Sequence, residues 1–289
     1  MYYTEILFSV NMTNIVDKRT EQYYDDAQIL YNLFWSDKAV HYGFWNNKTK
    51  RLSDALENTN RFVSKLLNLQ ENDYVLDVGY GVGGSSFSIA GKFGVKVKGI
   101  TSSNTQIKQA ERNARKLHLD DLVSFEIMDF NKTRFKDKTF TKIFGIESVC
   151  HSCSKPAFLK EAYRLLRPDG RIVVVDGFLT KRDLTQKEDE IHNKCLLGWK
   201  VPSLSHKDDF LDDLRKAGFK NIGFYDKTDE VIPSSRRITF YGYLFFPLSF
   251  ILGKLRLISK NLHENSVAMI NQRKTFHNFT VYGVFVAEK

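Results

Sequence analysis

The sequence predicts a doubly wound α/β domain built on a seven-stranded sheet, and three observations support this. Short apolar segments alternate with amphipathic, helix-compatible segments from residue 74 onward. A glycine-rich turn follows the first apolar segment at residues 79–84. Several later apolar segments end at an acid, as at Asp129, Glu147 and Asp176. Alternating strands and helices build a mainly parallel sheet whose ligand crevice lies at the carboxyl ends of its strands.

The strands are expected where apolar and β-branched residues cluster. We place them at residues 74–79, 96–101, 123–128, 141–146, 171–176, 220–226 and 281–287. The segment at 171–176 is almost wholly apolar, as a strand buried on both faces should be. The turn Pro168-Asp169-Gly170 precedes it.

Helices are expected between these strands, at residues 84–93, 103–118, 154–166 and 208–217. The second carries an apolar stripe at helical spacing, which runs Ile107, Ala110, Ala114, Leu117. Ser154 is a suitable N-cap for the third, and Gly218 a suitable stop for the last.

Four segments organise the chain: an N-terminal helical cap at 1–70, an α/β core at 71–230, a hydrophobic lid at 231–275 and a final core strand at 276–289. The lid contains the aromatic run Phe240–Leu252. A membrane span needs about 20 apolar residues, and this run is shorter and is interrupted by Pro247. We interpret this run either as a lid over a pocket or as an interfacial patch, and the second interpretation includes peripheral membrane contact.

Composition excludes several classes of protein. A hydrophobic share of 42% supports a buried core. The net charge is +9, but Lys and Arg are scattered, so we expect no nucleic-acid partner. Three cysteines form no disulfide framework, and the N-terminus does not resemble a signal peptide. We therefore expect a cytoplasmic location; a homodimer stays open.

The glycine-rich turn admits two cofactors. Gly79, Gly81 and Gly84 satisfy the dinucleotide fingerprint. That fingerprint also needs an acid about 20 residues on, at the end of the second strand, where this chain has Thr101-Ser102. A carboxylate inside the motif, Asp77, suits a ligand with a cationic end. S-adenosylmethionine carries an ammonium and a sulfonium, so it is the preferred cofactor.

The string Asp77-x-Gly79-x-Gly81-x-Gly83 resembles the first motif of the class I methyltransferases, which have a Rossmann-like sheet. The segments 147–151, 41–45 and 282–289 resemble the branch of sterol, tocopherol and prenyl-diphosphate C-methyltransferases, which also holds natural-product N- and O-methyltransferases. The resemblance runs from about Tyr23 to the end. Tyr80 departs from it, because that branch usually has Cys there.

The candidate cofactor residues lie at the ends of the first four strands. The glycines are expected against the methionyl part, Asp77 near the ammonium or orienting the loop, and the polar residues after the second strand near the ribose. Asp129 would accept from the adenine amine, or would simply cap the strand end before Asn131. The full set is Asp77, Gly79, Gly81, Gly83, Thr101, Ser102, Gln106, Met128, Asp129, Phe130 and Glu147.

The resemblance implies a methyltransferase acting on a hydrophobic small molecule. We expect C-methylation of an isoprenoid or lipid-like substrate, with a prenyl diphosphate as one option and a carbocation that can cyclise. An N- or O-methyltransferase of an amine or phenol is the alternative, and a nucleic-acid methyltransferase a third. The catalytic candidates are Glu147, His151 and Tyr24. The single C-x-x-C at Cys150–Cys153 lacks a second pair at zinc spacing, so no metal is expected.

Aromatic rings stabilise carbocations, and guanidinium groups pair with anionic head groups. Aromatic residues outside the strands and the arginines before the aromatic run are therefore the substrate candidates. They are Tyr31, Trp35, Tyr42, Trp45, Trp199, Arg236, Arg237, Tyr241 and Phe245.

Overall fold

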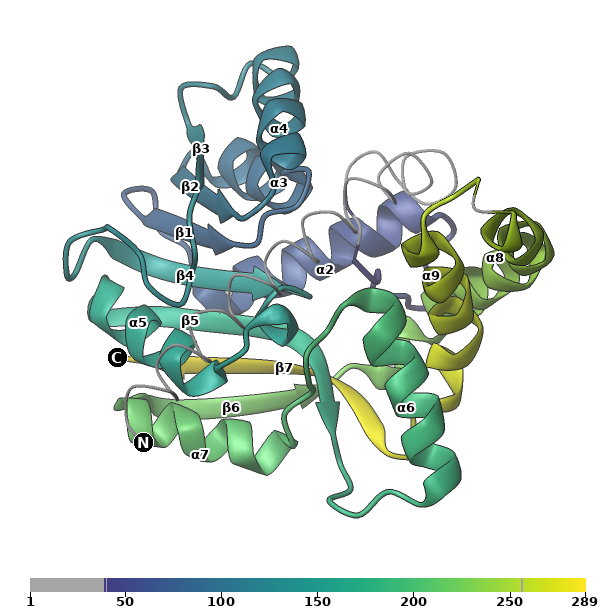
Figure 1. The fold of residues 1–289 in the computed structure, drawn as a ribbon. Helices are drawn as coiled ribbons and strands as arrows, with labels where there is room; N and C mark the ends of the chain where they lie inside the picture. Colours follow the sequence, from purple (N-terminus) through teal and green to yellow (C-terminus); the bar gives the residue numbers. More distant parts are fainter. Residues whose placement is uncertain (1–38, 40, 256) are drawn as a thin grey trace, which may run out of the picture.

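A computed structural model describes residues 39, 41–255 and 257–289, and its centre is a seven-stranded sheet (Figure 1). The strand order is β3-β2-β1-β4-β5-β7-β6, and β7 runs antiparallel to both its neighbours while the other pairs are parallel. The strands are β1 (Tyr74–Val78), β2 (Lys96–Thr101), β3 (Val123–Ile127), β4 (Phe140–Ile146), β5 (Leu166–Leu179), β6 (Lys220–Asp226) and β7 (Thr280–Glu288).

Helices cover both faces of the sheet, because its central strands are apolar on both sides. Val75 and Val173 belong to one buried cluster, which includes residues of α2, α3 and α4. Their neighbours Leu76 and Val174 point the other way, into a second cluster with α5 and α7. The helices are α2 (Leu52–Leu67), α3 (Gly84–Phe93), α4 (Asn104–Lys116), α5 (Lys155–Leu165) and α7 (Lys207–Ala217).

Two expected elements differ in detail. The turn at 168–170 lies inside the long strand β5, where the pairing with β4 shifts from Phe140↔Leu166 to Lys142↔Arg171. Asp169 has a positive φ of 62° there, so the chain does turn, but as a bulge within the strand. Helix α2, which the sequence assigned to an N-terminal cap, packs against β4 and β5.

A three-helix layer lies beside the carboxyl ends of the central strands. It consists of α6 (Gln186–Trp199), α8 (Thr228–Lys254) and α9 (Lys260–Asn271), with both α6 and α8 packed on α9 (Figure 1). Helix α8 continues through Pro233 and Pro247, although the sequence suggested an interrupted segment. No helix among the described residues is long and apolar enough to cross a membrane.

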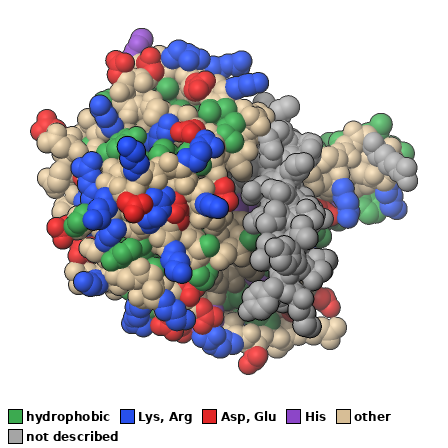
Figure 2. Space-filling view, turned by 60° about the vertical axis from the view of Figure 1, so that its left-hand side comes forward, with side chains coloured by type: hydrophobic (Ala, Val, Ile, Leu, Met, Phe, Trp, Pro, Cys, Tyr) green, Lys and Arg blue, Asp and Glu red, His purple; other side chains and the backbone are tan. Residues whose placement is uncertain are grey.

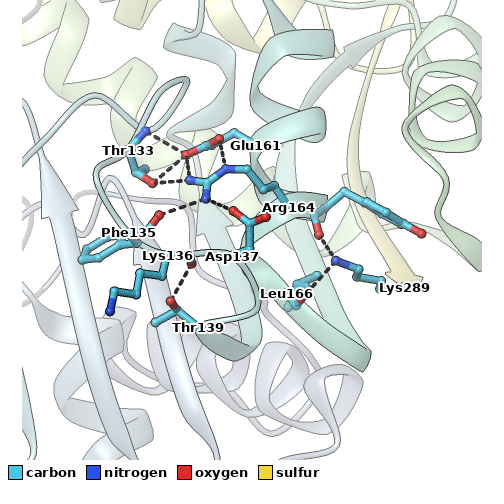
Figure 3. Close-up of polar contacts among 10 residues, drawn as sticks. Thr133, Phe135, Lys136, Asp137, Thr139, Glu161, Arg164, Leu166 and Lys289 are labelled. Carbon is cyan, nitrogen blue, oxygen red and sulfur yellow. Dashed lines mark hydrogen bonds and ion pairs between the residues drawn. The ribbon is translucent and has the colours of Figure 1, made fainter.

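A polar network fixes the loop between β3 and β4 to α5 (Figure 3). The Arg164 guanidinium donates to Glu161 at 2.7 Å, to Asp137 at 2.6 Å and to the carbonyl oxygen of Phe135 at 2.9 Å. Glu161 in turn accepts from the backbone and hydroxyl of Thr133. Multidentate arginine contacts of this kind are geometrically specific, so this loop is held where it leaves the end of β3.

Candidate active site

A cavity of about 270 Å³ opens at the carboxyl ends of β1, β2, β4 and β5, and α6, α8 and α9 close its other side. Strand order reverses between β1 and β4, which is where open α/β sheets bind their ligands. Among the residues that the structure describes, the cavity wall contains 15 of the sequence-predicted site residues. They are Tyr42, Asp77, Gly79, Gly81, Thr101, Ser102, Gln106, Met128, Asp129, Phe130, Glu147, His151, Trp199, Tyr241 and Phe245.

The glycine turn forms one end of the cavity. Gly79 has a φ of +76°, and a Cβ there would lie 2.3 Å from the Cβ of Ser148, so only glycine fits. The buried carboxyl of Asp77 accepts a hydrogen bond from the Ser86 hydroxyl at 2.6 Å. Burial raises the pKa of Asp77 to about 7, against the lowering effect of Ser86. An open backbone turn beside a desolvated carboxyl fits a ligand with a cationic end, as S-adenosylmethionine has.

Gly83 is not among the residues that line the cavity, and its contact with the cofactor stays a prediction. It is the N-cap of α3 with a φ of 89°, and a Cβ there would meet the Phe87 ring at 2.7 Å. The positive φ and the close approach of the Phe87 ring therefore account for a glycine at position 83. The next two residues, Gly84 and Ser85, face the cavity instead.

The ends of β2 and β3 form the adjoining wall. The Thr101 hydroxyl donates to Gln106 Oε1 at 2.8 Å, so these two predicted ribose contacts are joined to each other. Asp129 Oδ1 accepts from both the backbone and the side-chain amide of Asn131, each at 2.8 Å. Asp129 thus does cap the strand end with one oxygen, and it lines the cavity as well.

Glu147 lies at the centre of the cavity wall, directly after β4. Its backbone is left-handed, with φ at 51°, which is uncommon for a residue other than glycine. Oε1 accepts from the Tyr42 backbone amide and from the Tyr282 hydroxyl, both at 2.7 Å. Burial raises the pKa of Glu147 to about 8; the two donors lower it, and nearby Asp176 raises it.

His151 is a weaker candidate for a base than Glu147. Burial lowers its pKa to about 4, so the imidazole is neutral at pH 7 and takes up a proton poorly. Asp176, which lies within the adjacent strand β5, accepts from the backbone amides of Cys150 at 2.8 Å and Gly177 at 3.0 Å. Burial raises the pKa of Asp176 to about 6.

The side of the cavity formed by α6, α8 and α9 carries the apolar and aromatic side chains Trp199, Tyr241, Phe245, Ile238 and Met269, together with the polar side chains of His192, Asn265 and Gln272. No lysine or arginine occurs in the described part of the wall. Among the described residues, no group of His, Cys, Asp and Glu side chains could hold a metal ion.

Three of the described substrate candidates, Trp45, Arg236 and Arg237, are not found on this wall. The indole Nε1 of Trp45 donates to Ser234 Oγ at 2.8 Å, which ties its segment to α8. Arg236 and Arg237 are exposed and do not line the cavity, although Arg237 stacks over the ring of the wall residue Tyr241. The candidates Tyr24, Tyr31 and Trp35 lie outside the described residues.

Sequence reasoning missed several wall residues. Asp176 carries the same strand-end signal as Glu147 and could have been found. Tyr282 lies inside the apolar strand β7, and only its hydroxyl group distinguishes it from the apolar residues around it. His41 and Gln272 also line the cavity; Gln272 Oε1 accepts from the Tyr42 hydroxyl at 2.9 Å, a pairing over long sequence separation that no local pattern signals.

This sheet order, with a glycine turn after β1 and an acid directly after β4, is the arrangement of the class I S-adenosylmethionine-dependent methyltransferases. Residues 13–211 match the family model of the mycolic acid cyclopropane synthetases, and the chain belongs to that family. The predicted fold, class and methyl donor are thereby confirmed.

Curated relatives agree with this membership. The sterol 24-C-methyltransferase of Kluyveromyces lactis is 30% identical over 215 residues, covering 74% of this chain and 57% of that enzyme. The chain thus spans little more than half the length of that relative. The methyltransferase GfsG of Streptomyces halstedii is 30% identical over 227 residues, covering 77% of this chain and 80% of the relative.

Solved structures agree on the fold. The [4+2]-cyclase SpnF superposes with a TM-score of 0.78 at 19% identity, covering 94% of this chain and 96% of its own. The geranyl diphosphate C-methyltransferase of Streptomyces coelicolor A3(2) gives a TM-score of 0.72 at 18% identity, covering 94% and 97%.

Proposed function

We propose that the protein methylates a carbon atom of a neutral, hydrophobic isoprenoid or lipid-like molecule. One observation carries this proposal. The described wall of the cavity combines apolar and aromatic side chains with carboxyl side chains, and it includes no lysine or arginine. The carboxyl groups are those of Asp77, Asp129, Glu147 and Asp176. Such a wall favours a ligand that is neutral or in which positive charge develops.

Charge develops in this way when an alkene is the acceptor. The cofactor supplies an activated methyl group, so the protein mainly positions the partners. The alkene π electrons form the new C–C bond, the C–S bond breaks toward sulfur, and a carbocation remains on the acceptor. Aromatic faces such as Trp199 stabilise it by about 2 kcal/mol when desolvated. Loss of a proton to the Glu147 carboxylate then restores an alkene.

A prenyl diphosphate fits this wall less well. Its anionic head needs cationic partners, but Arg236 and Arg237 are exposed outside the cavity. This narrows the broader sequence-based expectation to acceptors without an anionic head. Methylation of a phenol or amine is the second candidate, because Glu147, with a pKa of about 8, is suited to remove a proton near neutral pH.

The direct test is an acceptor panel. Purified protein is incubated with S-adenosylmethionine and a sterol with a side-chain alkene, geranyl diphosphate, a tocopherol-type phenol or a primary amine. Products are identified by mass spectrometry and NMR, which also reveals cyclisation. Turnover of the sterol-type alkene is expected. Turnover confined to the amine, the phenol or the diphosphate would reject the proposal.

The isosteric variant Glu147→Gln tests the proton acceptor. Loss of a positioned acid–base group costs about 10²–10⁴ in rate, so turnover should fall by about that factor while cofactor affinity is kept. The matched control is Glu57→Gln on α2, since Glu57 pairs with Lys92 away from the cavity. Equal turnover in the two variants would remove Glu147 from its assigned role.

A further inference from the structure

Helix α8 presents two different apolar faces. Ile238, Tyr241 and Phe245 line the cavity. On the solvent-facing side, Phe240 is 65% exposed and Leu244 is 58% exposed. Spacings of three and four residues place the exposed side chains on one stripe of the helix. The stripe comprises Phe240, Tyr243, Leu244, Leu248, Ile251 and Leu255, and we call it the outer face.

The outer face is flanked by positive charge. Arg236 and Arg237 precede it by about one helical turn, and Lys254 is three residues after Ile251, so all three share its side of the helix. All three are exposed. The sequence has no Asp or Glu between Glu230 and Glu264, so nothing in this stretch neutralises them.

We propose that the outer face of α8 docks on an anionic lipid bilayer, with the helix lying in the plane of the interface. Apolar and aromatic side chains would enter the boundary between head groups and acyl chains, and the basic residues at either end would pair with lipid phosphates. A contiguous exposed apolar patch of this kind usually marks an interaction site.

Charge favours lipid over a second copy of the chain. Two-fold pairing places identical patches against each other. Whichever way two outer faces were aligned, Arg236, Arg237 or Lys254 of one copy would meet basic residues of the other, because no acid lies in this stretch. Like charges placed opposite one another disfavour such a complex. An anionic membrane has no such conflict.

The inference is independent of the proposed reaction, because binding to lipid requires no turnover. It also has a structural link to the cavity. The same helix turns that expose Phe240 and Leu244 place Tyr241 and Phe245 on the cavity wall. A docked protein would therefore hold its cavity beside the membrane.

Vesicle flotation tests the proposal without cofactor or acceptor. Wild-type protein should float with vesicles of phosphatidylcholine and phosphatidylglycerol, and much less with phosphatidylcholine alone. The variant Leu244→Asn/Leu248→Asn should lose about tenfold or more in binding. The matched control is Leu117→Asn, because Leu117 is 53% exposed at the end of α4, away from α8.

A second variant separates charge from apolar contact. Arg236→Gln/Arg237→Gln leaves only Lys254 of the three, so it should show a smaller preference for the anionic vesicles and a weaker salt sensitivity than the wild type. Circular dichroism and cofactor binding confirm that each variant is folded. Two results would overturn the inference: equal flotation of wild type, Leu117→Asn and the double leucine variant, or no flotation together with a dimer in sedimentation that Leu244→Asn/Leu248→Asn dissociates.

Discussion

The hydroxyl of Tyr282 donates to Glu147 Oε1 at 2.7 Å, and so joins the antiparallel last strand to the strand-end acid of β4. This bond lowers the pKa of Glu147, while burial raises it. A residue at the far end of the chain therefore helps to set the ionisation of the proposed proton acceptor.

Replacing Tyr282 by Phe should shift the pH dependence of kcat/KM to higher pH. With one donor lost, the pKa of Glu147 rises further, so the limb of the kcat/KM profile that reports its ionisation should shift to higher pH. The control is Tyr42→Phe, because the Tyr42 hydroxyl donates to Gln272, while only its backbone amide contacts Glu147. Identical shifts in the two variants would show that the Tyr282 bond is not what sets this pKa.

Stability of the ligand-free protein should fall as pH rises from about 6.5 to 8.5. Glu147 and Asp77 have pKa values raised to about 8 and about 7, so the folded state holds protons in this window that the unfolded state has released. Binding more protons when folded means that stability falls with rising pH. His41 and His151, with pKa values lowered to about 4, act in the opposite direction only below about pH 6.5.

Thermal unfolding across this range measures the effect. Glu147→Gln has no charge to bury, so its melting temperature should decline less steeply between pH 6.5 and 8.5 and should exceed that of the wild type at the upper end. Parallel curves for the two proteins would contradict the assignment of a buried, reluctantly ionised carboxyl at this position.

Asp129→Ala should weaken cofactor binding by about 10- to 150-fold when the carboxylate accepts from the adenine amine, since hydrogen bonds to charged groups contribute about 1.5–3 kcal/mol. Asn131→Ala is the comparison, because it removes the side-chain amide that contacts Asp129 but leaves the carboxylate. Calorimetry with S-adenosylmethionine distinguishes them. Equal losses would mean that Asp129 only shapes the loop.

Gly79→Ala should fail to bind the cofactor, and in the worst case fail to fold, because its Cβ would overlap Ser148 at a positive φ. Gly91→Ala is the matched control: the nearest atom to a new Cβ lies 3.6 Å away, and α3 is helical there. That change should be neutral or stabilising by about 0.5–1 kcal/mol. Denaturant unfolding and cofactor titration test both variants.

The sheet was predictable from sequence because each strand is a local apolar run and each connecting helix carries a local stripe or cap. The α5 cap shows this, with Ser154 accepting from the Ala157 amide as predicted. Glu147 could be placed for the same reason: an acid that directly follows a buried strand must lie at the crevice.

Other features depend on contacts between distant segments. Gly83 matches the motif by its spacing, but its backbone lies directly against the ring of Phe87. The arginines before the aromatic run suggested an anion site. In the structure, Arg236 and Arg237 are exposed on α8, and neither lines the cavity. The Lys and Arg side chains on the face shown in Figure 2 are interspersed with acids, as their scatter in the sequence suggests.

The two faces of α8 have a consequence for how this enzyme would be assayed. A helix that touches both a bilayer and the cavity gives an apolar acceptor a route that avoids bulk water. The relevant concentration of such an acceptor is then its mole fraction in the membrane. Diluting it with inert lipid at constant total amount would slow turnover, whereas changing the volume of buffer around the vesicles would have little effect.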